Sequence, residues 1–139
     1  ELGLTPLNPK EVNVIDFVKS KTDGEGCDVL FECSGSDIAA KEMTEITRVS
    51  GTICMVSVHK KPHEVDLRQL NFKEQLMVGT RVYTKEEFRQ AVELSEVLQE
   101  SLEKVVSHIV PLKDSEKVFD MIADSECGTV KVVVDCTEV

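Results

Sequence analysis

The sequence predicts an α/β protein built on a mostly parallel sheet, and two observations favour this class. Segments whose apolar residues recur with helical spacing alternate along the chain with short apolar segments rich in β-branched residues. One short segment, TICMVSV at residues 52–58, is apolar on both faces, as a strand inside a parallel sheet is. The 139 residues are enough for one domain with a hydrophobic core.

The first predicted element is a helix over residues 9–22. Asn8 is a suitable N-cap, the proline that follows it suits the first helical position, and Glu11 completes the spacing of a capping box. Two glycines, Gly24 and Gly26, are expected to end this helix.

The next elements alternate between strand and helix. The strand DVLFEC, residues 28–33, stops on Cys-Ser-Gly, and a second helix is predicted over residues 36–51. The strand at 52–58 follows it. The polar segment HKKPHEVD, residues 59–66, contains a proline and is expected to be a loop, after which QLMVGT at 75–80 is predicted as a short strand.

The C-terminal part repeats the alternation. The sequence TKEE at 84–87 is a capping box that opens a helix. VVSHIVPL at 105–112 is predicted to be extended, and Asp114 is expected to cap a further helix, which Gly128 ends. TVKVVVDC at 129–136 is the last predicted strand.

Composition excludes several classes of partner. The formal net charge of −10 argues against nucleic acid and against anionic membrane surfaces. The sequence contains no run of about 18 apolar residues, so no transmembrane helix is predicted. The first ten residues show neither the basic start nor the apolar core of a signal peptide. The five cysteines include no Cys-x-x-Cys pair, which favours reduced thiols in a cytoplasmic protein.

Small or polar residues follow three of the predicted strands, at residues 33–35, 57–59 and 79–81. Ligands of parallel α/β sheets bind beyond the carboxyl ends of the strands, so these turns would lie along one edge. Such a row suits a flat, extended ligand such as a dinucleotide. Small residues also suit any turn from strand to loop, and spacing alone does not separate these two interpretations.

Other site chemistries have little support. No Gly-x-Gly-x-x-Gly follows a strand, because DGEGCD follows a helix. The two histidines of HKKPHE flank a proline and cannot share a helix face as zinc ligands do in His-Glu-x-x-His, so they are interpreted as loop residues. Cys33 precedes a predicted helix start, which keeps a reactive thiol as an alternative. No catalytic residue and no metal ligand is assigned.

Four segments, taken in order, resemble the coenzyme-binding domain of medium-chain, zinc-type alcohol and polyol dehydrogenases. They are NPKEVNVIDFVKSKTDGEGCDVLFECSGS, VSGTICMVSVHKKPHEVDL, FKEQLMVGTRVYT and PLKDSEKVFDMIADSECGTVKVVVD. The third is most similar to the polyol, butanediol and threonine dehydrogenase branch. The resemblance implies a Rossmann sheet of order 3-2-1-4-5-6 and hydride transfer between a zinc-bound alcohol and the nicotinamide of NAD or NADP.

The resemblance also implies roles for particular residues. The adenosine side of the coenzyme would be lined by Cys33, Ser34 and Gly35. The turn beside the nicotinamide ring would consist of Ser57, Val58 and His59. The strand end whose backbone holds the carboxamide would consist of Val78, Gly79 and Thr80. Lys131 matches a position near the pyrophosphate, although an exposed lysine on an end strand explains it equally well, and Arg81 is a weaker phosphate or ribose contact.

The chain departs from the family in what it does not contain. The family's first strand, its glycine-rich turn and its zinc-bearing catalytic domain would lie upstream of Glu1, and TPLN at residues 5–8 would be the third strand. We therefore expect a partial Rossmann fold, a single partial dinucleotide-binding domain over residues 1–139 that lacks the first strand and the glycine-rich turn. Such a piece would be inactive alone and would bind no zinc. A stand-alone, non-catalytic nucleotide-binding or protein-interaction module is the alternative.

The missing first strand has a consequence for assembly. In the family's order the strand DVLFEC pairs with strand 1, so its outer edge is expected to be unpaired here. Exposed strand edges pair readily with other chains. The sequence therefore predicts a homodimer or larger assembly, either through this edge or through the edge of QLMVGTRV.

Overall fold

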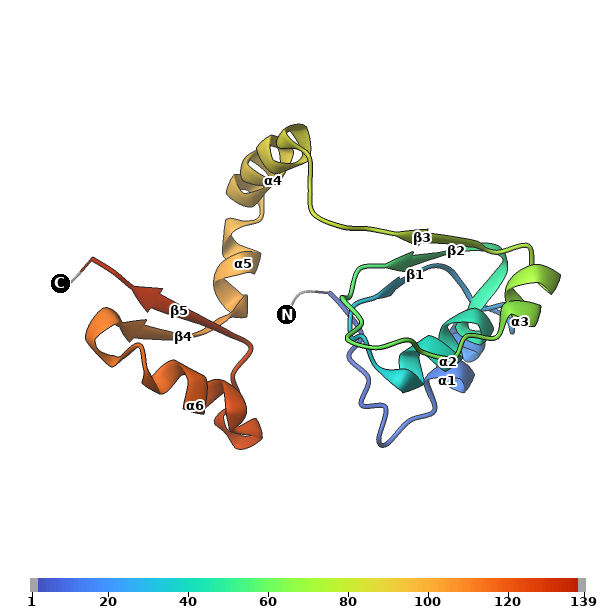
Figure 1. The fold of residues 1–139 in the computed structure, drawn as a ribbon, viewed down its shortest axis with the longest axis horizontal. Helices are drawn as coiled ribbons and strands as arrows, with labels where there is room; N and C mark the ends of the chain where they lie inside the picture. Colours follow the sequence, from blue (N-terminus) through green and yellow to red (C-terminus); the bar gives the residue numbers. More distant parts are fainter. Residues whose placement is uncertain (1–2, 138–139) are drawn as a thin grey trace. The chain divides into compact units, whose positions relative to one another are not determined.

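Parallel strands form two separate sheets in the structure (Figure 1). The computed structural model describes residues 3–137, whose backbone divides into a first unit, Gly3–Val82, and a second unit, residues 83–137. The α/β class with parallel strands and flanking helices is confirmed. The alternation had indicated one sheet, but the pairing of strands depends on contacts that no local pattern records. The single domain over residues 1–139 stays a prediction, and its ends at 1–2 and 138–139 lie outside the described residues.

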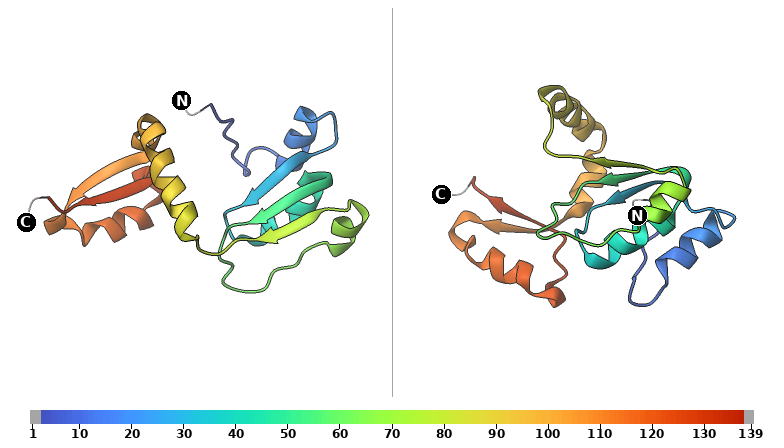
Figure 2. Two further views of the ribbon diagram at one scale, coloured as in Figure 1. Left: turned by 90° about the horizontal axis from the view of Figure 1, so that it is seen from above. Right: turned by 45° about the vertical axis from the view of Figure 1, so that its right-hand side comes forward.

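The first unit holds a three-stranded sheet in the order β1-β2-β3. Its strands are β1 (Cys27–Glu32), β2 (Thr47–Met55) and β3 (Leu76–Gly79), and both neighbouring pairs are parallel. Figure 2 shows the three strands side by side from two further directions. The strand positions match the predicted ones closely at β1 and β3.

Two helices, α1 (Val14–Lys21) and α2 (Asp37–Ile46), cover one face of this sheet (Figure 1). The core lies under α2, where Met43 is 1% exposed, and on β2, where Ile53 is fully buried. On the opposite face the alternation of the strands leaves apolar side chains exposed, namely Val29, Phe31, Leu76 and Val78.

Helix α2 runs into β2 without a loop, since Ile46 ends the helix and Thr47 begins the strand. The predicted helix over residues 36–51 is therefore too long. The carbonyls at the junction are covered from a distant segment: the Nζ atom of Lys73 donates to those of Thr44, Glu45 and Thr47, at 2.9, 3.0 and 3.0 Å. The side-chain amide of Gln75 donates to the carbonyls of Thr44 and Thr47, at 2.9 and 2.7 Å. These donors stabilise an early helix end that the local sequence does not indicate.

The first predicted helix start is also wrong. The carbonyl of Asn8 accepts hydrogen bonds from the amides of Glu11 and Val12, both at 3.0 Å, which closes only a single turn. Helix α1 begins at Val14, and its N-cap is Asn13, whose side chain accepts from the amide of Asp16 at 3.0 Å. The segment at 5–8, expected as a short strand, forms none.

One helix of the first unit has no counterpart in the sequence prediction. Helix α3 (Leu67–Phe72) follows the polar loop, and Asp66 caps it by accepting from the amides of Arg68 and Gln69. Among residues 3–137, no helix has both the length and the apolar character needed to cross a membrane.

The second unit begins with α4 (Lys85–Val97), and its predicted capping box is confirmed. The hydroxyl of Thr84 accepts from the amide of Glu87 at 3.2 Å, while the carboxylate of Glu87 accepts from the amide of Thr84 at 2.6 Å. Helix α5 (Gln99–Val105) continues from it towards the second sheet.

That sheet pairs β4 (Val106–Pro111) with β5 (Lys131–Asp135) in parallel. Helix α6 (Lys117–Ala123) lies between them in the chain, together with short 3₁₀ turns at Leu112–Asp114 and Ser125–Cys127. Asp114 is not the N-cap that the sequence predicts, because it lies in the first of these turns and accepts from Lys117 Nζ at 2.6 Å. The left-handed Gly128 follows the second turn.

Candidate functional site

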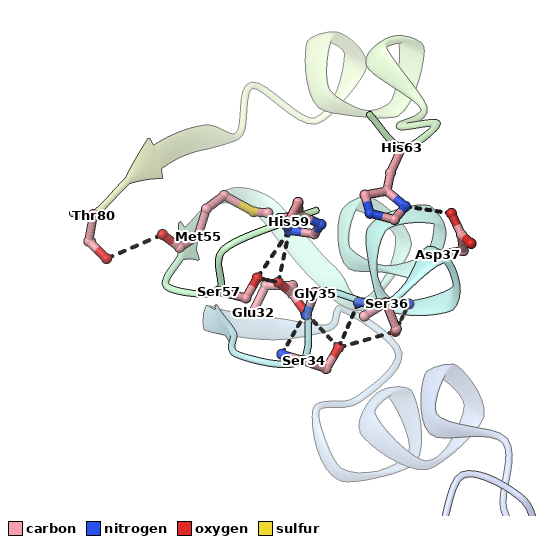
Figure 3. Close-up of polar contacts among 11 residues, drawn as sticks. Glu32, Ser34, Gly35, Ser36, Asp37, Met55, Ser57, His59, His63 and Thr80 are labelled. Carbon is pink, nitrogen blue, oxygen red and sulfur yellow. Dashed lines mark hydrogen bonds and ion pairs between the residues drawn. The ribbon is translucent and has the colours of Figure 1, made fainter. Parts of the chain in front are cut away.

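Three turns meet at the carboxyl edge of the first sheet (Figure 3). The amides of Val56 and Ser57 donate to the carbonyl of Glu32, at 2.9 and 3.0 Å, which ties the turn after β2 to the end of β1. The amide of Thr80 donates to the carbonyl of Met55 at 3.0 Å, and its hydroxyl reaches the same oxygen at 3.2 Å. The structure therefore places the predicted residues at 33–35, 57–59 and 78–80 along one edge.

Glu32, the last residue of β1, lies at the centre of this edge, and its side chain is 1% exposed. One carboxylate oxygen, Oε1, accepts from the amide and hydroxyl of Ser34, at 2.9 and 2.7 Å, and from the amide of Gly35 at 2.9 Å. The other, Oε2, accepts from the hydroxyl of Ser57 and lies 3.1 Å from Nε2 of His59. A single carboxylate therefore contacts both turns.

These contacts decide the protonation state of Glu32. Burial by itself raises the pKa of this carboxyl, but the hydrogen bonds donated by Ser57, Ser34 and Gly35 outweigh burial and lower the pKa from 4.5 to about 2. Glu32 is consequently an anion at neutral pH. Sequence reasoning missed it. The available signal was a lone carboxylate at the end of an apolar strand, directly before a serine and a glycine whose amides can turn back to it.

Two histidines extend the network into the loop that follows β2. The rings of His59 and His63 meet edge to face with centroids 4.7 Å apart. Nδ1 of His63 contacts a carboxylate oxygen of Asp37, whose other oxygen accepts from Lys61 Nζ at 3.0 Å. The hydrogen bonds from His63 and Lys61 lower the pKa of Asp37, the first residue of α2. The network thus joins the loop to the start of the helix.

The turn after β1 also borders a groove of about 650 Å³ between β1 and α2. Its walls are mainly apolar, with Leu30, Ile38 and Ala39 among them, and Cys33 and Ser34 stand at its rim. The hydrogen-bonding groups of the site contact serines rather than Cys33, and the role of Cys33 as a wall residue of a coenzyme site stays a prediction.

Two of the turns contain a glycine, Gly35 in the first and Gly79 in the third. Gly35 has a φ of +66°, and a Cβ there would stand 3.6 Å from the Cβ of Ser57. A Cβ added to Gly79 would have no neighbour within 4 Å. Val58, between Ser57 and His59, is 68% exposed and presents an apolar side chain at the same edge.

The remaining predicted residues lie elsewhere. Lys131 is the first residue of β5 in the second unit, where it is exposed, and its pyrophosphate role stays a prediction. Arg81 is exposed just past Thr80. All five cysteines are free thiols. Over residues 3–137, no three side chains of His, Cys, Asp or Glu come together as a metal site would require.

Comparisons with known proteins agree with this geometry. A family profile described as zinc-binding dehydrogenase matches residues 1–97. A 2-dehydro-3-deoxy-L-galactonate 5-dehydrogenase from Pseudoalteromonas atlantica is 35% identical over 98% of this chain, and the chain covers 40% of that protein. An L-threonine 3-dehydrogenase from Bacillus velezensis is 30% identical over 96% of this chain, which covers 39% of it.

A solved structure shows the shared fold. The crystal structure of 2R,3R-butanediol dehydrogenase from Bacillus subtilis superimposes with a TM-score of 0.82 at 24% identity, over 95% of this chain and 38% of that one. The chain therefore spans about 40% of the length of the curated relatives it matches. With a family profile that covers residues 1–97, the chain belongs to the zinc-binding dehydrogenase family.

Proposed function

We propose that this chain forms one wall of the coenzyme site of an NAD(P)-dependent dehydrogenase, and that the longer protein oxidises a secondary alcohol or polyol with the help of zinc. The observation that carries the proposal is the row of three turns held together at the carboxyl edge of a parallel sheet. The names of the relatives support the substrate class, because a sugar acid, a hydroxy amino acid and a diol all offer a secondary hydroxyl.

The residues at this edge fit a dinucleotide. The groove beside Cys33 and Ser34 has the volume and apolar lining of small-molecule sites and would take the adenosine half. The turn at 57–59 would face the nicotinamide, with Val58 as an apolar wall. The exposed backbone around Gly79 leaves room for the carboxamide. When bound, the nicotinamide exchanges hydride with the alcohol carbon, and the protein holds and orients it.

Zinc does not fit the residues described here, since no cluster of three ligands exists among residues 3–137. We propose that the ligands of the zinc belong to another part of the longer protein. The 139-residue chain would then be inactive by itself, because no group here holds the alcohol for hydride transfer.

Nuclear magnetic resonance on the ¹⁵N-labelled 139-residue chain tests the proposal, since it detects weak binding to a partial site. The chain would be titrated with NADH and separately with AMP and with nicotinamide mononucleotide. We expect AMP to shift the amide resonances of residues 33–35 and the mononucleotide to shift those of 57–59 and 78–80. Ribose 5-phosphate is the matched control, because it carries the phosphate without a base.

Each other outcome has a distinct meaning. Shifts confined to other surfaces, or none at millimolar ligand, would contradict the proposal. Micromolar NADH binding by this chain alone would indicate a complete site and favour a stand-alone nucleotide-binding module. Zinc analysis of the same sample accompanies the titration, and stoichiometric zinc would contradict the placement of the metal elsewhere.

A further inference from the structure

Glu32 makes side-chain contacts with both halves of the candidate site. Its Oε1 atom holds the amides of Ser34 and Gly35, each at 2.9 Å, in the turn assigned to the adenosine half. Its Oε2 atom holds the hydroxyl of Ser57, in the turn assigned to the nicotinamide half. The backbone adds to this, because the carbonyl of Glu32 accepts from the amides of Val56 and Ser57.

Within residues 3–137, no lysine or arginine pairs with this carboxylate. Its partners are two backbone amides, two serine hydroxyls and the imidazole of His59. A buried charge destabilises a protein unless hydrogen bonds satisfy it. Moving any of these partners away would therefore leave the buried carboxylate less well satisfied and would cost free energy. The carboxylate therefore restrains both turns more strongly than neutral side chains would.

Catalytic chemistry is a poor explanation for this residue. The side chain is 1% exposed, so neither substrate nor water reaches it directly. Its low pKa, about 2, leaves it unable to take up a proton at neutral pH. Asp28, at the other end of the same strand, is the contrasting case, because its carboxylate is 80% exposed and pairs with Arg48 at 2.6 Å.

We propose that Glu32 is a positioning residue that couples the adenosine-side turn to the nicotinamide-side turn and so fixes the spacing between the two halves of the coenzyme site. The proposal rests on the proposed function for the identity of the ligand. The coupling itself is a property of the chain without ligand, so it can be measured separately.

The first measurement is amide hydrogen exchange without coenzyme. Ser57→Ala removes a donor to Oε2 and leaves the β1 turn untouched, so a coupled pair of turns should show faster exchange at the amides of Ser34 and Gly35. We expect an increase of about ten-fold, since one hydrogen bond to a charged group is at stake. Asp28→Asn is the matched control on the same strand and should leave both amides unchanged. Unchanged exchange in Ser57→Ala would overturn the coupling, whatever the coenzyme does.

The second measurement uses the half-ligands. In the unsubstituted chain, AMP bound at residues 33–35 should also shift the amide resonances of Ser57 and His59. In Glu32→Gln the near shifts should persist and the far shifts should disappear, because a carboxamide has one acceptor oxygen and cannot accept from both turns at once. Far shifts of equal size in both proteins would refute Glu32 as the link. An unsubstituted chain that shows no AMP shift at all would instead count against the proposed function, while the exchange experiment still decides the coupling.

Discussion

Glu32 should make the free energy of unfolding of the first unit fall at acidic pH, and the substitution Glu32→Gln should remove this pH dependence. The folded-state pKa of about 2 lies below the ordinary value of 4.5, so the carboxylate stabilises the fold above pH 4.5 and loses that effect as the pH falls through 2. Each unit of difference between the unfolded and folded pKa contributes about 1.4 kcal/mol to the free energy of unfolding, which gives about 3 kcal/mol for this side chain. The side chain is almost fully buried, so solvent screening does not reduce this figure much.

The assay compares the unsubstituted chain with Glu32→Gln by urea unfolding at several pH values between 3 and 7. Hydrogen exchange on peptides from β1 and β2 reports on the first unit alone. We expect the gap in unfolding free energy to be about 3 kcal/mol near neutral pH and to shrink steadily below pH 4.5. Other carboxylates titrate equally in both proteins and cancel. A gap that stays constant down to pH 3, or no gap at pH 7, would refute the reasoning, and Asp28→Asn should show no comparable trend.

Three further predictions concern the junction and the sheet edge. Lys73→Met should lower the unfolding free energy by about 2 kcal/mol, because the carbonyl of Glu45 loses a charged donor; Lys41→Met, on an exposed side chain, is the control. Combining Lys73→Met with Gln75→Leu should cost more than the sum of the two single changes, since each side chain covers carbonyls that the other also covers; an additive result in urea unfolding would show that the two donors act separately. We also expect the chain to self-associate, because β1 pairs on one side only among residues 3–137; light scattering after size exclusion measures this, and a strictly monodisperse monomer would contradict it.

Local patterns predicted the elements that local physics decides. The strand at β1 was placed within one residue of Cys27–Glu32, and the capping box at Thr84 was found because its two hydrogen bonds lie within four residues. The end of α2 was misplaced because its stabilising donors, on Lys73 and Gln75, are 26 or more residues away in sequence. Which strands share a sheet depends on equally distant contacts.

The candidate site divides in the same way. Residues 33–35, 57–59 and 79–81 could be predicted to lie together, since parallel strands bring their carboxyl ends to one edge. Glu32 could not, because a carboxylate at a strand end usually faces solvent, and only the turn of Ser34 and Gly35 back onto it shows that it is buried. The contact between His63 and Asp37 likewise joins a loop to a helix start 26 residues earlier.

The direct passage from α2 to β2 at Ile46 and Thr47 also limits how the gene can change in length. Lys73 and Gln75 each donate to the carbonyls of both Thr44 and Thr47, so one codon inserted at this junction would separate two acceptors that a single side chain now covers. The same codon inserted in the loop at 59–66 would lengthen a segment with no helix or strand. Insertions and deletions among homologous genes should therefore accumulate in the loop and spare the junction.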